Sequence, residues 1–172
     1  MNYTTIIDHF GNQLHRFVVP ENIKRKLDEE SVYVLSNIGL PQKIVYIKFS
    51  FYSEVFIDET DQSIVLGYHA RYKDWEMKLS INDCSIYHYW KSEKDADAYC
   101  FYNSSVKKLL LCLYESDVFY FNIIAKQALG DYHKHHDEYS KALESIITKI
   151  DPDATTKGAW YSYIEEMSTG AV

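Results

Sequence analysis

The sequence predicts an α+β fold in which a single domain spans residues 1–172. Segments with alternating apolar residues, which are typical of strands, come before segments with apolar residues at helical spacing. Strands and helices do not alternate along the chain as they would in a parallel α/β sheet. No internal repeat, low-complexity segment or linker divides the sequence. We therefore expect one mostly antiparallel sheet with short N-terminal helices and with C-terminal helices packed on it.

The first thirty residues are expected to form a loose lead-in followed by a short helix. Pro20 suits the first position of a helix because its fixed φ is already helical. Ile23 and Leu27 are four residues apart and would share one helix face. A second short apolar stretch follows and ends at Gly39, which together with Pro41 is a strong stop signal.

Alternation of apolar and polar residues predicts the strands. They are expected at residues 44–51, 63–68, 75–81, 84–90 and 98–102. Strand 75–81 alternates most clearly, with Trp75, Met77, Leu79 and Ile81 on the inward face. The polar segment 58–62 is expected to form a turn. Asn82 tolerates the positive φ of a tight hairpin, so strands 75–81 and 84–90 are expected to pair directly.

Helical spacing begins at residue 106. Asn103–Ser105 offer N-capping side chains, and apolar residues then recur at i, i+3, i+4 and i+7. A second helix is expected after Gly130 and ends at Pro152, and a final short helix follows Gly158.

The charge of the chain excludes several classes of partner. Eighteen Lys and Arg against 25 Asp and Glu give a formal net charge of −7. Nucleic-acid binding normally needs a basic face, and docking on an anionic membrane needs the same sign of charge. No apolar run is long enough for a transmembrane helix, and the N-terminal residues predict no signal peptide. An acidic surface instead suits a partner protein that is itself basic.

The sequence does not carry the motifs of common enzyme classes. It has no phosphate-binding glycine loop, no nucleophile elbow and no zinc-deaminase signature. Cys84, Cys100 and Cys112 lie far apart in apolar or aromatic stretches, which is typical of reduced, buried thiols in a cytosolic protein. We expect no catalytic residue and no cofactor, and the sequence does not predict an enzyme.

One cluster has the spacing of a metal site. His133, His136 and Asp137 would lie within one turn of a helix and could converge on one ion. The alternative is that they form the polar first turn of that helix, with His136 on its apolar stripe. No further ligand is evident, so no metal is expected, and a small hydrolase or metal enzyme at this cluster is the least favoured function.

The most one-sided block of charge contains Glu54, Asp58, Glu59 and Asp61 with no Lys or Arg between them. It is either a hairpin loop that its charge keeps solvated or part of a surface for a basic partner. Several tyrosines in the predicted strands allow a similar pair of interpretations, as packing under helices or as exposed anchors. These are Tyr46, Tyr68, Tyr72, Tyr87 and Tyr89.

Three stretches of the chain resemble one family. Residues 35–41 (LSNIGLP) are similar to an "L…GLP" element, residues 102–113 (YNSSVKKLLLCL) to an "NSS…F…CL" signature, and residues 150–166 to a "DP-A…W…EE" ending. Together and in this order they resemble the SUKH superfamily of bacterial immunity proteins, and within it the fourth SUKH group. Residues 63–67 depart from the family, which commonly has a small-residue-rich "GS-G" stretch near this point.

The resemblance implies a curved sheet of about six strands with helices packed against it. It also implies a cytoplasmic antidote that is encoded beside a secreted polymorphic toxin, frequently a nuclease or a nucleic-acid deaminase. The family has no catalytic residues to transfer. We therefore expect an immunity protein that binds and inactivates a cognate, basic toxin domain in the cytoplasm.

The candidate contact residues combine the acidic block with a neighbouring turn. They are Glu54, Asp58, Glu59, Asp61, Tyr72, Asp74 and Trp75. The alternative function is a protein-interaction or regulatory module of the same fold with a partner other than a toxin. The sequence favours neither a monomer nor a dimer.

Overall fold

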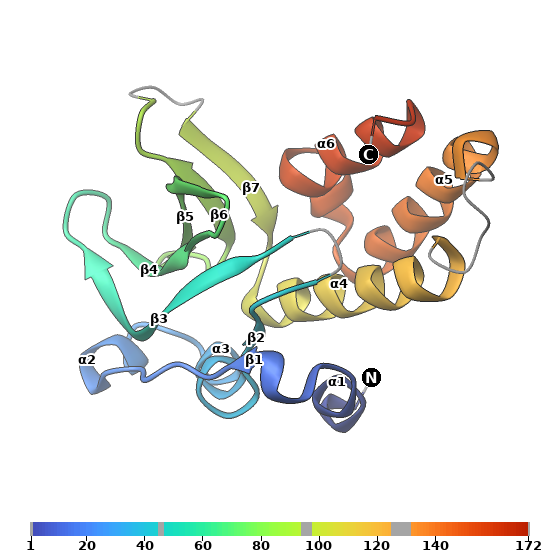
Figure 1. Ribbon diagram of the computed structural model, residues 1–172. Coiled ribbons are helices and arrows are strands. Elements are labelled where there is room, and N and C mark those ends of the chain that lie inside the picture. The colour runs from blue at the N-terminus through green and yellow to red at the C-terminus, as the bar shows by residue number, and fades with distance from the viewer. Residues whose placement is uncertain (1, 45–46, 94–97, 125–131, 172) are drawn as a thin grey trace.

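The computed structural model describes residues 2–44, 47–93, 98–124 and 132–171, and it has the α+β fold that the sequence predicts (Figure 1). The main sheet is antiparallel, and its strands follow one another in chain order. These strands are β3 (Phe49–Asp58), β4 (Ser63–His69), β5 (Tyr72–Ser80), β6 (Ile86–Trp90) and β7 (Tyr99–Asn103). A small second sheet pairs β1 (Leu14–His15) with β2 (Leu40–Pro41).

The helices lie before and after the main sheet in the sequence. They are α1 (Tyr3–Phe10), α2 (Glu21–Lys24), α3 (Glu29–Tyr33), α4 (Val106–Phe119), α5 (Tyr132–Ile150) and α6 (Gly158–Ser168). In Figure 1, α1 to α3 lie below the sheet, and α4 to α6 form a group to its right. Helix α5 contacts both α4 and α6, and α6 contacts β7. No helix in the described part of the chain is both long enough and apolar enough to cross a membrane.

The expectation of a loose lead-in before Pro20 is wrong for residues 3–10. Asn2 caps α1, because its side-chain oxygen accepts a hydrogen bond from the Thr4 N–H at 3.1 Å. Ile6 and Phe10, four residues apart, are both buried in the core. A capping Asn followed by this spacing is an ordinary helix signal.

The first strand also differs from its prediction. The sequence places it at 44–51, whereas β3 begins at Phe49 and continues to Asp58. Its middle bulges away from β4 between Phe51 and Phe56. There the N-terminal segment pairs with it, since the Val18 N–H donates to the Ser53 carbonyl at 2.9 Å. The expectations for residues 45, 46 and Gly130 fall outside the described residues.

The hairpin between β5 and β6 forms as predicted, with Leu79 opposite Ile86. The positive φ belongs to Cys84 at 58°, however, and not to Asn82. All three cysteines are free, but only Cys112 is buried; Cys84 and Cys100 are half-buried, which corrects the expectation of three buried thiols.

The core lies between one face of the sheet and the helices. Met77, Leu79 and Ile86 point to this face and are fully buried in the same cluster as Leu109 of α4 and Leu143 of α5. Alternate residues of a strand point to opposite faces. Glu76 and Lys78, which alternate with Met77 and Leu79 in β5, therefore face away from the helices. They belong to the site described below.

A buried carboxylate joins the β7–α4 junction to the end of α5. Asp151 is fully buried and accepts hydrogen bonds from the Ser104 N–H at 2.7 Å and from Asn103 Nδ2 at 3.0 Å. Asn103 in turn accepts a hydrogen bond from Trp160 Nε1 at 3.0 Å. Lys108 Nζ lies 3.3 Å from the same carboxylate. We call these five residues the Asp151 cluster.

Candidate functional site

The turn between β3 and β4 is held by its own acidic side chains. Asp58 Oδ1 accepts the Thr60 N–H at 2.9 Å, and Asp61 Oδ1 accepts the Ser63 N–H at 3.0 Å. Gln62 takes a positive φ of 57°, and its N–H donates to the Asp58 carbonyl at 2.8 Å. Asp side chains commonly satisfy backbone N–H groups two residues ahead in this way. The other carboxylate oxygen of each Asp is left to bind something else.

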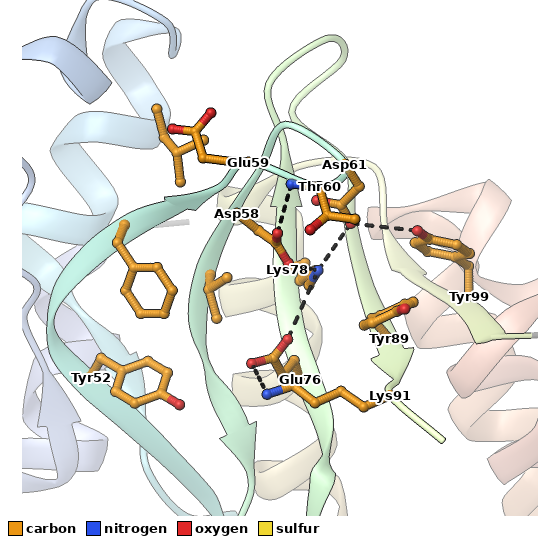
Figure 2. A pocket seen from close by; sticks show the side chains of 13 residues that line it. Tyr52, Asp58, Glu59, Thr60, Asp61, Glu76, Lys78, Tyr89, Lys91 and Tyr99 are labelled. Carbon is orange, nitrogen blue, oxygen red and sulfur yellow. Dashed lines mark hydrogen bonds and ion pairs between the residues drawn. The ribbon is translucent and has the colours of Figure 1, made fainter. Parts of the chain in front are cut away.

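That other group is a buried lysine (Figure 2). Lys78, which faces away from the helices in the middle of β5, is only 1% exposed. Its Nζ donates to Asp58 Oδ2 at 2.6 Å and to Asp61 Oδ2 at 3.0 Å, and lies 3.8 Å from Glu76 Oε2. The same ammonium lies 4.2 Å from the centre of the Tyr89 ring. An ammonium removed from water is costly, and several anionic partners with an aromatic face offset that cost.

Glu76 connects this lysine to a second, exposed one. Its side chain is 7% exposed, and its Oε1 lies 2.7 Å from Nζ of Lys91 at the end of β6. The Lys91 side chain is half-exposed, so it can move away without unfolding the strand. Glu76 is therefore a buried carboxylate whose outer partner is a half-exposed surface cation.

These groups line a hollow of about 520 Å³ on the face of the sheet that points away from the helices. Its charged lining consists of Asp58, Glu59, Asp61, Glu76, Lys78 and Lys91. Four carboxylates against two ammonium groups give the hollow a net negative charge, and we call it the acidic pocket. Aromatic side chains complete it, and two of them are well exposed: Phe56 at 46% and Tyr99 at 45%.

The electrostatics favour charged carboxylates in the acidic pocket. The hydrogen bond from Lys78 and the backbone N–H of Thr60 lower the pKa of Asp58 to about 2. Burial raises the pKa of Asp61, but hydrogen bonds from Ser63 and Lys78 lower it by more, so the net shift is downward. Burial lowers the pKa of Lys78, yet its hydrogen bonds to Asp58 and Asp61 raise it above the ordinary value overall. Asp58, Asp61 and Lys78 therefore keep their charges over the physiological pH range.

The structure brings together three of the four acidic residues singled out in the sequence. Asp58, Glu59 and Asp61 all line the acidic pocket. Glu54 does not, because it lies in the bulge of β3, where it is exposed and bridges to Val18. The interpretation of the acidic block as part of a surface for a basic partner stays a prediction. Two of its carboxylates fold the turn, and the same turn forms one wall of a pocket.

The three remaining candidates lie elsewhere. Tyr72, Asp74 and Trp75 lie toward the other end of the β4–β5 hairpin from the acidic turn. Tyr72, opposite His69, is about 20 Å along the strands from Ser63 at the ordinary rise per residue. Trp75 also belongs to the other face of the sheet, because it alternates with Glu76. The seven candidate residues therefore do not form one continuous surface.

Sequence reasoning missed the centre of the pocket. Glu76 and Lys78 alternate with apolar residues in β5, so they were expected on the polar outer face and not beneath a turn. Lys91, Tyr89 and Tyr99 were not assigned to any site. The available signal was the pairing of strands: Glu76 lies opposite Tyr89, which lies opposite Tyr99.

The helical cluster with metal-site spacing can be followed only in part. His136 and Asp137 lie in the first turns of α5, where Asp137 accepts a hydrogen bond from Lys141 Nζ at 2.6 Å. The side chain of His133 is outside the described residues. Within the described part, no three His, Cys, Asp or Glu side chains gather in a way that could hold a metal ion.

Neither family models, curated proteins nor solved structures give a match to this chain.

Proposed function

We propose that this chain is an immunity protein of the SUKH kind, which binds and neutralises a basic toxin domain through its acidic pocket. The observation that carries the proposal is the pocket itself, where partly exposed carboxylates that already pair with Lys78 and two exposed aromatic rings line one hollow. Such a surface attracts a cationic side chain and gives it aromatic rings to pack against.

The mechanism would be electrostatic steering followed by occlusion. A nuclease or deaminase cleft is basic because its substrate is a polyanion, and an acidic protein face can occupy the same cleft. Glu59 at the rim would meet the toxin first, since its side chain is exposed. Phe56 and Tyr99 offer large exposed rings, which are typical anchors of protein interfaces.

The residues that carry the resemblance support a division of labour within the fold. Asn103, Asp151 and Trp160, from two of the three similar stretches, meet in the Asp151 cluster. These positions hold the fold and leave the sheet face free to differ between proteins. Residues 63–67, the stretch that departs from the resemblance, lie in β4. This strand runs along the acidic pocket and contributes Val65 to its lining.

The test is co-expression with the toxin domain encoded by the neighbouring gene. We expect growth to be rescued and a complex to elute from a sizing column, with an affinity that falls as salt is raised. Glu59→Lys should weaken the complex by tenfold or more, because it reverses a charge at the rim. Glu144→Lys is the matched control, since Glu144 is an exposed residue of α5 far from the pocket in the sequence and on another element.

The outcomes separate the function from the site. Absence of both rescue and complex would overturn the immunity function, and recovery of a different basic protein would favour the regulatory alternative. A complex that Glu59→Lys and Glu144→Lys affect equally would retain the function but remove the acidic pocket from the interface. Cytoplasmic location is part of the same proposal and is tested by fractionating cells that express the native gene.

A further inference from the structure

A second hollow lies on the other face of the sheet, between its β4–β7 strands and α6. It has a volume of about 510 Å³, and a smaller hollow of about 160 Å³ adjoins it. Trp75, His88 and Cys100 line both, so the two hollows lie side by side along a common wall. We call the two together the tryptophan pocket, and it shares no lining residue with the acidic pocket.

The walls of the tryptophan pocket are mostly aromatic. All three tryptophans of the chain, Trp75, Trp90 and Trp160, line it. At its mouth the Tyr72 ring lies 5.2 Å from His69 at an interplanar angle of 30° and 5.3 Å from Trp75 at 34°. The Tyr72 ring is therefore stacked on His69 and tilted against Trp75, and Tyr72 is 47% exposed. Such an arrangement can stack a further flat ring.

A buried polar residue, His88, belongs to the lining of both hollows. His88 is 7% exposed, and its Nε2 makes no hydrogen bond within the described residues. Burial, together with nearby His69, lowers the pKa of His88 to about 3, so the ring is neutral at physiological pH. A neutral imidazole offers one N–H donor and one acceptor nitrogen. A buried nitrogen without a partner calls for an explanation, and a bound polar edge is one.

We infer that the tryptophan pocket binds a small, planar heteroaromatic molecule that stacks on Trp75 and Tyr72 and hydrogen-bonds to His88. Its volume is in the usual range for small-molecule sites, which are mostly apolar with a few polar groups. An aliphatic ligand would use neither the ring faces nor the imidazole. A metal is disfavoured because, besides His88, the adjoining walls offer only His69 and Cys100 as nitrogen or sulfur ligands, and burial raises the pKa of the Cys100 thiol.

The inference is independent of the proposed function. Glu76 and Lys78 point to one face of β5, and Trp75 and Met77 point to the other. A ligand in the tryptophan pocket would therefore leave the acidic pocket open. The expected consequence of binding is stabilisation of the sheet against α6, which supplies Trp160 and Tyr163 to the lining.

The test uses adenine as the probe and the tryptophans as reporters. We expect saturable quenching of tryptophan fluorescence and shifts of the Trp75 and Trp90 indole signals in NMR spectra. His88→Phe keeps the ring but removes its nitrogens, and it should weaken adenine binding about tenfold, the usual effect of one lost hydrogen bond. Cys100→Phe should abolish binding, because it places a bulky ring in the wall that lines both hollows.

Two controls keep the result interpretable. Tyr161→Phe alters an exposed residue of α6 outside the lining and should bind adenine as the wild type does. Thermal unfolding of each variant without ligand confirms that it is folded. The absence of a saturable change in the folded wild-type protein would overturn the inference. So would binding of toluene to the wild type as tightly as adenine, or binding of adenine to His88→Phe as tightly as to the wild type. Loss of a toxin complex in Cys100→Phe without any adenine binding would assign the pocket to the toxin instead.

Discussion

Two buried charges in this protein are treated in opposite ways. Asp151 is an anion whose partners are two neutral donor residues, Ser104 and Asn103, and one lysine. Lys78 is a cation whose partners are acidic residues. Both are almost completely removed from water, at 0% and 1% exposed. They differ in where the partners lie.

The difference separates a structural cluster from the proposed binding surface. The hydrogen bonds of the Asp151 cluster join β7, α4 and α6, and Asn103 and Trp160 are themselves buried, whereas its lysine, Lys108, is 39% exposed. Around Lys78 the partners are partly open, with Asp58 25% and Asp61 18% exposed. A buried charge that is hydrogen-bonded to buried side chains of other elements holds the fold, whereas one whose partly exposed acidic partners line a hollow can also attract a ligand.

The largest effect on stability is expected from disrupting the Asp151 cluster. Asp151→Ala would leave the Ser104 N–H and the Asn103 amide buried without an acceptor and should lower the free energy of unfolding by about 3–5 kcal/mol. Urea unfolding measures this. Asp153→Ala is the matched control, since Asp153 is exposed two residues away, and it should change stability by less than about 0.5 kcal/mol. Equal effects of the two substitutions would show that the cluster is not structural.

A smaller effect is expected from removing the buried cation. Lys78→Met keeps the buried stem but leaves Asp58, Asp61 and Glu76 without their shared ammonium, and it should cost about 2 kcal/mol because these carboxylates can regain water. The control is Lys91→Met, where a half-exposed pair is lost and about 0.5 kcal/mol is expected. If Lys78→Met is neutral in urea unfolding, the turn does not depend on its ammonium.

The pH dependence of stability follows from the pKa of Asp58. Its value falls from an ordinary 3.8 to about 2 in the fold, so at low pH the unfolded chain takes up a proton first. The stabilisation is complete above about pH 4 and is lost as the pH falls through about 2. Asp58→Asn should be less stable than the wild type at neutral pH, with a difference that shrinks toward pH 2. If the difference in the free energy of unfolding between Asp58→Asn and the wild type stays constant from neutral pH to pH 2, the lowered pKa of Asp58 is contradicted.

The smallest effect is expected at the rim of the acidic pocket. Glu59→Gln removes one exposed charge and should leave the free energy of unfolding unchanged within about 0.5 kcal/mol. It should slow association with a basic partner about threefold at low salt, because rim charges act on the association rate. Stopped-flow binding with Glu144→Gln as the control measures this. A change in the dissociation rate alone would place Glu59 in direct contact and not at the rim.

Much of the fold could be predicted because its signals are local. Ser105 caps α4 by accepting the Lys108 N–H at 3.2 Å, and the residues at helical spacing after it, such as Leu109 and Leu113, are buried. Pro152 follows the end of α5 as its missing N–H requires. The missed helix α1 carried the same kinds of signal, in Asn2 and in the spacing of Ile6 and Phe10.

The candidate site could be predicted only in part, because its members are distant in the sequence. Asp58 and Asp61 were identified by their charge, but their partner Lys78 lies 20 and 17 residues further along the chain. Tyr72 and Trp75, which were grouped with them by nearness in the sequence, belong to the other end of the hairpin and line the tryptophan pocket instead. Nearness along a hairpin does not mean nearness in space.

The sequence by itself therefore determined the order of strands and helices, where most of them end, and the acidic character of the β3–β4 turn. Each of these depends on backbone preferences and spacing within a few residues. Only the tertiary structure decided that Lys78 is buried and Glu59 exposed, because an alternating strand gives polar residues a face without saying what covers it. Here the β3–β4 turn covers Lys78 through Asp58 and Asp61, and the same turn forms one wall of the acidic pocket.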